Sequence, residues 1–305
     1  VRDAEGATLA ETDWPKAAGA LDEALGRTLE WLAGEGGGSA PAAIGHRIVH
    51  GGLAFDAPVR LEAETLRRLD ALSPLAPLHQ PFNLAAVRAA QDRFPGAVQV
   101  GCFDTAFHAA QPRLARLYAL PRDLTDGGVL AYGFHGLSYD FIAGELRDRF
   151  GPGCGGRVIV AHLGSGVSLC ALTDGQSLAT TMGFSALDGP PMATRSGSLD
   201  PGVLLYLMED RGISAADLTD LLYRRSGLLG VSGESGDVRT LLASDRPEAQ
   251  EALDLFVYRL SWEIGGLAAV LGGADRLVFT AGVGENAAEI RARVLQACAW
   301  LGAEL

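Results

Sequence analysis

The chain has 305 residues, an apolar content of 48% and a formal net charge of -12. Its length suits two domains with separate cores. The acidic balance argues against nucleic acid or an anionic membrane as a partner, because both attract basic surfaces. The single lysine, Lys16, lies in DWPKAAG, so the P-loop pattern GxxxxGK[ST] and the strand lysine of protein kinases are both absent.

Strands and helices are expected to alternate along the chain. Helices are predicted where apolar residues recur every three or four positions, and strands where short apolar runs end at Gly or Asp. This alternation predicts an α/β protein whose sheets are covered by helices. The expected elements are a helix over 13–32, a strand over 43–49, helices over 62–72 and 83–94, a strand over 97–103, a helix over 134–150, strands over 158–163 and 167–172, helices over 200–208 and 249–271, a buried strand over 276–281 and a last helix.

Several local signals refine this outline. Asn83 is a plausible N-cap, and Asp200 followed by Pro201 is typical of a helix start. The run GPGCGG over 151–156 is the best linker candidate. The four cysteines show no CxxC spacing, which favours reduced thiols in a cytosolic protein. No apolar run reaches the length of about 20 residues that a membrane span needs. The start without Met and the helical end favour a fragment that lacks both termini.

The motif GHRIVHGG contains the first candidate site residues. The histidines His46 and His50 would lie roughly 13 Å apart on a strand, too far for one zinc ion. Alternation places both of them with Ile48 on one face, and Arg47 with Val49 on the other. A guanidinium beside an apolar side chain could bind a small carboxylate, and the alternative is an ordinary surface arginine.

Three further segments each place a polar side chain at the end of an element. Leu78 and His79 lie in a Pro-rich loop, where packing or capping is the ordinary alternative. Asp104 ends an apolar strand, as metal-binding or catalytic carboxylates do in α/β enzymes, although an N-cap is equally compatible. Phe134 and His135 lie between glycines at a helix start, where an imidazole stabilises charge or caps the helix.

The C-terminal half contains the signals for phosphate binding. The turn Gly164, Ser165, Gly166 offers unobstructed N–H groups, as does a plain hairpin. Arg195 lies among small residues before a helix, and a transferring phosphoryl group requires such a cation. The segment FTAGVGENAAEI has the order strand, GxG, helix, and it also fits the dinucleotide fingerprint GxGxxA.

Eight segments in this order resemble the acetokinase family of the acetate and sugar kinase, Hsp70 and actin superfamily. They are GHRIVHGG, LAPLH, FDTAFH, YGFHG, HLGSG, MGFSALDGPPMATRSGSLDP, SGLLGVSGESGDVR and FTAGVGENAAEIR, and they span His46 to the C-terminus. The resemblance implies two duplicated ribonuclease H-like domains with the active site in the cleft between them. The N-terminal domain would be 1–151, without its first strands, and the nucleotide-binding domain 152–305, without its C-terminal end.

The resemblance also implies an activity and its partners. The enzyme would transfer the γ-phosphoryl group of ATP reversibly to acetate, giving acetyl phosphate and ADP. It would need Mg²⁺ or Mn²⁺ and would be a cytoplasmic homodimer. The alternatives are a propionate or other short-chain acyl kinase, an NAD-dependent oxidoreductase based on GVGENA, and a non-catalytic ATP-binding module of the Hsp70 or actin type.

Carried over by position, the resemblance assigns roles to individual residues. Arg47 and Arg195 would bind the carboxylate and the transferring phosphoryl group, and His135 would stabilise transition-state charge. Asp104 would help to place the metal indirectly, with the main metal ligands expected outside this fragment. Ser165, Ala186 and Val238 stand where the family usually has Asn, Pro and Phe. The acyl pocket would comprise Arg47, Val49, Leu78, Phe134 and Ala186. The ATP site would comprise His162, Leu163, Gly164, Ser165, Gly166, Asp237, Val238, Arg239, Gly282, Val283, Gly284, Glu285 and Asn286.

Overall fold

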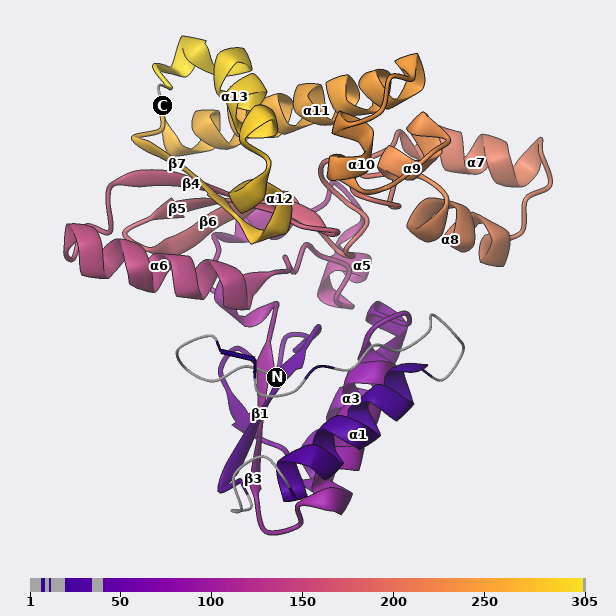
Figure 1. The fold of residues 1–305 in the computed structure, drawn as a ribbon, viewed down its shortest axis with the longest axis vertical. Helices are drawn as coiled ribbons and strands as arrows, with labels where there is room; N and C mark the ends of the chain where they lie inside the picture. Colours follow the sequence, from indigo (N-terminus) through magenta and orange to yellow (C-terminus); the bar gives the residue numbers. More distant parts are fainter. Residues whose placement is uncertain (1–6, 9–10, 12–19, 35–40, 304–305) are drawn as a thin grey trace.

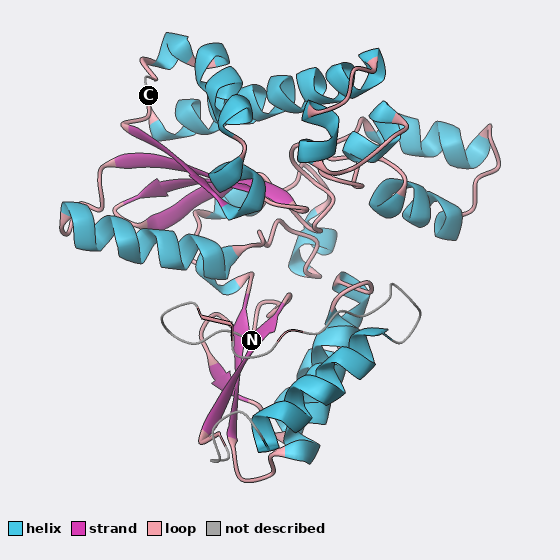
Figure 2. Cartoon of the chain, in the orientation of Figure 1, coloured by secondary structure: helices cyan, strands magenta, loops and turns pink. Residues whose placement is uncertain are grey.

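The computed structural model describes residues 7–8, 11, 20–34 and 41–303, which contain two β-sheets with helices packed around each (Figure 1). The smaller sheet has the strand order β1-β3-β2, and the larger sheet has the order β6-β5-β4-β7. Helices cover both faces of the larger sheet, and a separate helical layer lies beside the smaller one (Figure 2). The expected α/β architecture is therefore present.

The smaller sheet is built on β3, its central strand. Strand β1 runs parallel to β3, with Arg47 opposite Cys102, and the short β2 pairs antiparallel with its other side. Buried apolar side chains of the strands pack against those of α2 and α3, and α1 contacts α3. These elements are β1 (Ala43–Ile48), β2 (Val59–Arg60), β3 (Val98–Phe103), α1 (Ala20–Gly34), α2 (Ala63–Asp70) and α3 (Gln80–Arg93).

The larger sheet lies between α6 and α11. Strand β4 pairs antiparallel with β5 and parallel with β7, and β6 pairs antiparallel with β5. Because both faces are covered, β4 is a continuous apolar run, in which Val158 and Val160 pack toward α6 while Ile159 and Ala161 pack toward α11. The elements are β4 (Arg157–Leu163), β5 (Val167–Thr173), β6 (Gln176–Thr180), β7 (Arg276–Thr280), α6 (Gly136–Phe150) and α11 (Pro247–Leu271).

The core of the larger sheet extends to residues that follow the strands and helices of the smaller one. Val49, Ala76 and Phe134 belong to the same buried cluster as Met182 and Met192. The two sheets therefore meet at a packed junction. The remaining elements are η1 (Ser73–Leu75), η2 (Ala106–His108), α4 (Arg113–Arg116), α5 (Arg122–Asp126), α7 (Pro201–Glu209), α8 (Ala215–Arg224), α9 (Gly227–Ser232), α10 (Val238–Leu242), α12 (Ala281–Asn286), α13 (Ala288–Ala297) and η3 (Ala299–Leu301).

The predicted elements are confirmed in type and order, with two corrections. Asn83 lies inside α3, which begins three residues earlier after the N-cap His79, so its predicted capping role is wrong. The strand expected to be buried over 276–281 is β7, an edge strand among the described residues, and its side chains are only partly buried. The Asp200 cap is confirmed, because its carboxylate accepts a hydrogen bond from the Gly202 amide at 2.8 Å. Residues 13–19 of the first expected helix lie outside the described part.

Two further expectations concern cysteines and membranes. Cys102, Cys154, Cys170 and Cys298 are all free thiols, and three of them are buried. Burial raises the pKa of the Cys170 thiol to about 12, which suppresses its reactivity. Among the described residues, none of the helices combines the length and hydropathy that membrane crossing requires. The domain boundary at 151–156 stays a prediction.

Substitution of Gly136 tests the packing at the start of α6. A Cβ atom there would overlap the carbonyl oxygen of Asp104 and approach Phe107 Cβ to 2.9 Å. We expect Gly136→Ala to lower the free energy of unfolding by about 1–3 kcal/mol in urea denaturation. The control is Gly144→Ala in the same helix, where a Cβ atom meets nothing within 4 Å. It should raise stability by about 0.5–1 kcal/mol, and equal effects of the two changes would contradict the packing.

Candidate active site

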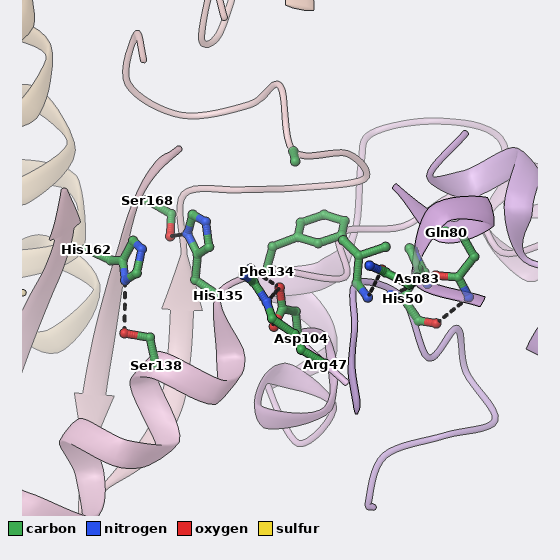
Figure 3. Close-up of polar contacts among 12 residues, drawn as sticks. Arg47, His50, Gln80, Asn83, Asp104, Phe134, His135, Ser138, His162 and Ser168 are labelled. Carbon is green, nitrogen blue, oxygen red and sulfur yellow. Dashed lines mark hydrogen bonds and ion pairs between the residues drawn. The ribbon is translucent and has the colours of Figure 1, made fainter. Parts of the chain in front are cut away.

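The loop that follows β1 has its backbone fixed by side chains. Each of the four N–H groups from Val49 to Gly52 donates a hydrogen bond to a side-chain acceptor, so the backbone of this loop is held without regular secondary structure. The acceptors are Asn83 Oδ1 for Val49 at 3.0 Å, Gln80 Oε1 for His50 at 3.3 Å, Thr105 Oγ1 for Gly51 at 3.0 Å and His50 Nδ1 for Gly52 at 2.9 Å. Figure 3 shows Asn83, Gln80 and His50.

The imidazole of His50 is completely buried within this loop. Its Nδ1 accepts the Gly52 hydrogen bond, so the ring proton lies on Nε2. That Nε2 is the one buried side-chain polar atom of the described residues that has no hydrogen-bond partner. The ring packs edge-on against Tyr132 and Phe134, with centroid distances of 4.5 and 5.7 Å. Burial lowers the His50 pKa to about 4, so the ring is neutral.

Arg47 and Asp104 form a paired site at the ends of β1 and β3. Arg47 Nε lies 3.0 Å from both carboxylate oxygens, and Nη2 lies 2.6 Å from Oδ2. The Asp104 side chain is 2% exposed, whereas that of Arg47 is 64% exposed. Burial raises the Asp104 pKa and the Arg47 contact opposes that rise, while the same hydrogen bonds raise the Arg47 pKa. The carboxylate therefore orients a guanidinium that remains open to an anion.

Asp104 also bears on the expected metal. Within the part of the chain that the structure describes, no three His, Cys, Asp or Glu side chains form a group that could hold a metal ion. The Asp104 carboxylate is already bonded to Arg47 through three contacts. The described residues therefore do not fit a metal site of their own, and the indirect metal role of Asp104 stays a prediction.

Arg195 and His135 converge on the turn between β4 and β5. Arg195 Nη1 donates to the Ala186 carbonyl at 3.1 Å, and burial lowers its pKa. A Cβ atom built on Gly166 would lie 3.3 Å from His135 Nε2 and 3.4 Å from Arg195 Nη1. Gly166 therefore lies against both groups, and a side chain at this position would crowd them. This is a physical reason for glycine in the turn.

His135 caps α6 in the left-handed conformation, with φ of 57°. Its ring stacks on that of His162, with centroids 4.2 Å apart. Burial lowers the pKa of His135 well below its usual value, and His162, Arg47 and Arg195 lower it further. Burial lowers the His162 pKa to about 4. Both rings are therefore neutral near pH 7, and the positive charge of the site resides on the two arginines.

The residues expected to contact the acyl group lie at the junction of the sheets. Val49 and Phe134 are 9% and 2% exposed within one apolar cluster, and Ala186 packs against that cluster. Leu78 is half-buried in the loop before α3. His79 is half-buried beside it, and its pKa is lowered by burial and then by Arg195 and Arg47. The structure thus brings an apolar surface close to both arginines.

A cavity of about 600 Å³ lies next to the β4–β5 turn. Eight of the residues expected to contact ATP line this cavity. Three others do not, because Leu163 is buried in β4, Gly284 is buried against Phe279 and Glu285 is exposed elsewhere on the surface. His162, at the end of β4, and Gly166, in the turn, do not line the cavity and lie toward His135. The eight are Gly164, Ser165, Asp237, Val238, Arg239, Gly282, Val283 and Asn286. Sequence reasoning missed the other lining residues, namely Val167, Ala193, Leu228, Gly236, Phe256 and Ala287.

The rim of this cavity includes an ion pair. The Asp237 carboxylate accepts a hydrogen bond from the Arg239 amide at 2.8 Å, which caps α10. It also contacts the Arg239 guanidinium, with Nη2 at 2.6 Å from Oδ2. These hydrogen bonds lower the Asp237 pKa to about 2. The arginine side chain is 87% exposed, so it is available to a bound molecule.

Comparison with known proteins decides the family. The model of the acetokinase family matches residues 5–305. The chain belongs to the acetokinase family. It is 52% identical to acetate kinase from Rhodopseudomonas palustris strain TIE-1, over all of this chain and 77% of that protein. It is 53% identical to acetate kinase from Methylocella silvestris, over 93% of this chain and 70% of that protein.

Solved structures of the family have the same fold. A propionate kinase from Francisella tularensis superposes with a TM-score of 0.87 at 36% identity, over 92% of this chain and 73% of that one. Acetate kinase from Porphyromonas gingivalis gives 0.84 at 38% identity, over 99% and 77%. The expected duplicated actin-type fold is confirmed. Membership of the family decides against the dinucleotide interpretation of GVGENA and against a non-catalytic module.

The buried histidines make stability dependent on pH. The folded pKa values of His50, His108 and His162 are about 4, and that of His135 is also well lowered. Below the unfolded value of about 6.5, the unfolded chain binds protons that the folded chain does not, so stability falls as pH falls. Each fully buried histidine contributes up to about 1.4 kcal/mol per pH unit. Burial raises the pKa of Glu263 to about 7, so its protonation stabilises the folded chain as pH falls. This is one group against four histidines.

We therefore expect the free energy of unfolding in urea to decrease between pH 7 and pH 5.5. The substitution His108→Asn removes one titrating group. The free energy of unfolding should then change less steeply with pH, by the contribution of one histidine, whatever the effect on absolute stability. A free energy of unfolding that stays constant or rises over this range would show that these rings are not held neutral.

Proposed function

We propose that the protein reversibly transfers the γ-phosphoryl group of ATP to acetate, giving acetyl phosphate and ADP. The observation that carries the proposal is the convergence on Gly166 of His135 Nε2 and Arg195 Nη1, at a turn that also lines the 600 Å³ cavity. A nucleotide in that cavity would present its phosphates to the turn. Relatives named acetate kinase at 52% and 53% identity support the assignment.

The chemistry needs no general base, because acetate is already ionised near neutral pH. Phosphoryl transfer then depends on alignment and on neutralising charge along the line of transfer. Arg195 and Arg47 supply two fixed cations, and Asp104 sets the direction of the second. The neutral ring of His135 adds a hydrogen-bonding group without adding charge. The apolar wall of Val49 and Phe134 would accommodate the methyl group.

Several partners and properties remain proposals. Mg²⁺ or Mn²⁺ would accompany ATP, held chiefly by phosphates and water, since magnesium commonly binds through substrate phosphates with few protein ligands. We expect a cytoplasmic homodimer that binds neither nucleic acid nor membrane. A propionate kinase among the structural relatives keeps propionate as the second candidate substrate.

Removal of Arg195 tests the reaction. Acetyl phosphate formed by the full-length protein from ATP, Mg²⁺ and acetate would be trapped with hydroxylamine. We expect Arg195→Ala to reduce kcat/KM by about 10³–10⁵, the range for a transition-state arginine. Arg149→Ala is the matched control, because Arg149 is exposed on α6 and pairs only with Glu145 among the described residues. No hydroxamate with acetate, propionate or butyrate would overturn the kinase assignment.

Substitution of Val49 tests the acyl pocket. Val49→Ala removes two methyl groups from a wall whose backbone is fixed through Asn83. We expect kcat/KM for propionate relative to acetate to rise roughly tenfold or more, since one methylene corresponds to about 1–3 kcal/mol. The exposed Val203→Ala on α7 should leave the ratio unchanged. An unchanged ratio in Val49→Ala would place the acyl group elsewhere.

A further inference from the structure

A line of three polar groups runs from His135 into the buried face between α6 and β5. Ser168 Oγ lies 2.9 Å from His135 Nδ1 and 2.5 Å from the Tyr139 hydroxyl oxygen (Figure 3 shows the first contact). Ser168 and Tyr139 are both 0% exposed. Water therefore does not reach either hydroxyl, and the protons of the two hydroxyls must be placed within this line.

Among the partners that the described residues offer, only one arrangement of protons satisfies all three groups. If Tyr139 donates to Ser168 and Ser168 donates to Nδ1, every hydroxyl proton has an acceptor. If Nδ1 instead carries a proton and donates to Ser168, one hydroxyl proton is left buried without an acceptor among the described residues. An unsatisfied buried donor costs about 1–3 kcal/mol. The hydrogen bonds therefore favour a ring whose proton lies on Nε2.

The protonation states of Tyr139 and His135 are consistent with this arrangement of protons. Burial raises the pKa of Tyr139 well above 10, so its phenol keeps the proton that it donates. The lowered pKa of His135 keeps its ring neutral, and the stacked ring of His162 is one of the groups that lower it.

We propose that Ser168 is a positioning residue that fixes His135 as the Nε2–H tautomer, with Tyr139 supplying the proton that directs the Ser168 hydroxyl. The Nε2 atom faces the position of Gly166 and Arg195, so its N–H is presented where the phosphoryl group would pass. The mechanistic meaning rests on the proposed function, whereas the tautomer is a property of the folded chain alone. His135 then acts as a neutral donor rather than as an imidazolium or a base.

The tautomer can be measured directly. Long-range ¹H–¹⁵N correlation spectra of the full-length protein, labelled in histidine, distinguish protonated from unprotonated ring nitrogens, and His135→Gln identifies the signals. At pH 7.5 we expect an unprotonated Nδ1 and a protonated Nε2. In Ser168→Ala, both nitrogen shifts should move toward the values of a ring that exchanges between tautomers. The matched control is Ser177→Ala, a buried serine that bonds His108 and Gln111 and should leave His135 unchanged.

Kinetics give a second readout. We expect Ser168→Ala to lower kcat severalfold while KM for ATP changes by less than twofold, because the ring loses its fixed orientation. We expect kcat of the parent to show no fall as pH rises through 6.5, since the working ring is neutral. A protonated Nδ1 in the parent, or unchanged shifts in Ser168→Ala, would overturn the proposal. A confirmed tautomer without acyl phosphate formation would instead count against the proposed function only.

Discussion

The structure depends on one buried aspartate, Asp104, whose amide and carboxylate bond residues of β1 and whose carbonyl bonds the first residue of α6. Asp104 donates its amide to the Ile48 carbonyl at 3.0 Å, accepts the Gly136 amide at 2.8 Å and pairs with Arg47 through its side chain. These contacts join the ends of β1 and β3 to the first turn of α6. A buried charge is tolerated only when it is paired, and removal of one partner leaves the other uncompensated. The position of Arg47 and the start of the helix that carries His135 are therefore set by the same residue.

The electrostatics of the site differ from those of the whole chain. The net charge is -12, yet Arg47 and Arg195 lie near histidines whose pKa values burial has lowered. Neutral rings add donors and acceptors without adding repulsion between cations. Fixed groups of this kind stabilise developing charge without reorganising during the reaction. In the proposed reaction, binding of anionic substrates would therefore rely on two directed guanidinium groups rather than on a broad basic surface.

Much of this arrangement could be predicted from local sequence signals. Five of the seven described strands were visible as apolar runs, whereas β2 and β6 were not, and the β4–β5 turn was visible from its glycines. The roles expected of the two arginines came from the order of the motifs that the chain shares with its family, because Arg47 alone is equally typical of an ordinary surface residue. The hydrogen bonds around the loop after β1 could not be predicted, because Asn83, Gln80 and Thr105 bond amides 34, 30 and 54 residues away. Such contacts depend on tertiary packing and leave no periodic pattern. A serine inside the apolar run VSLCAL was the available hint of a buried polar contact at Ser168.

In the loop after β1, the residues that hold the backbone differ from the residue proposed to shape the acyl pocket. Its amides are held by the side chains of Asn83, Gln80, Thr105 and His50. The side chain of Val49 packs in the apolar cluster and takes no part in these hydrogen bonds. A change of size at Val49 would therefore leave the backbone of the proposed pocket in place, along with the charged groups proposed to align the phosphoryl transfer. Substrate range can drift by single substitutions while the catalytic apparatus stays intact, which suits a family that includes both acetate and propionate kinases.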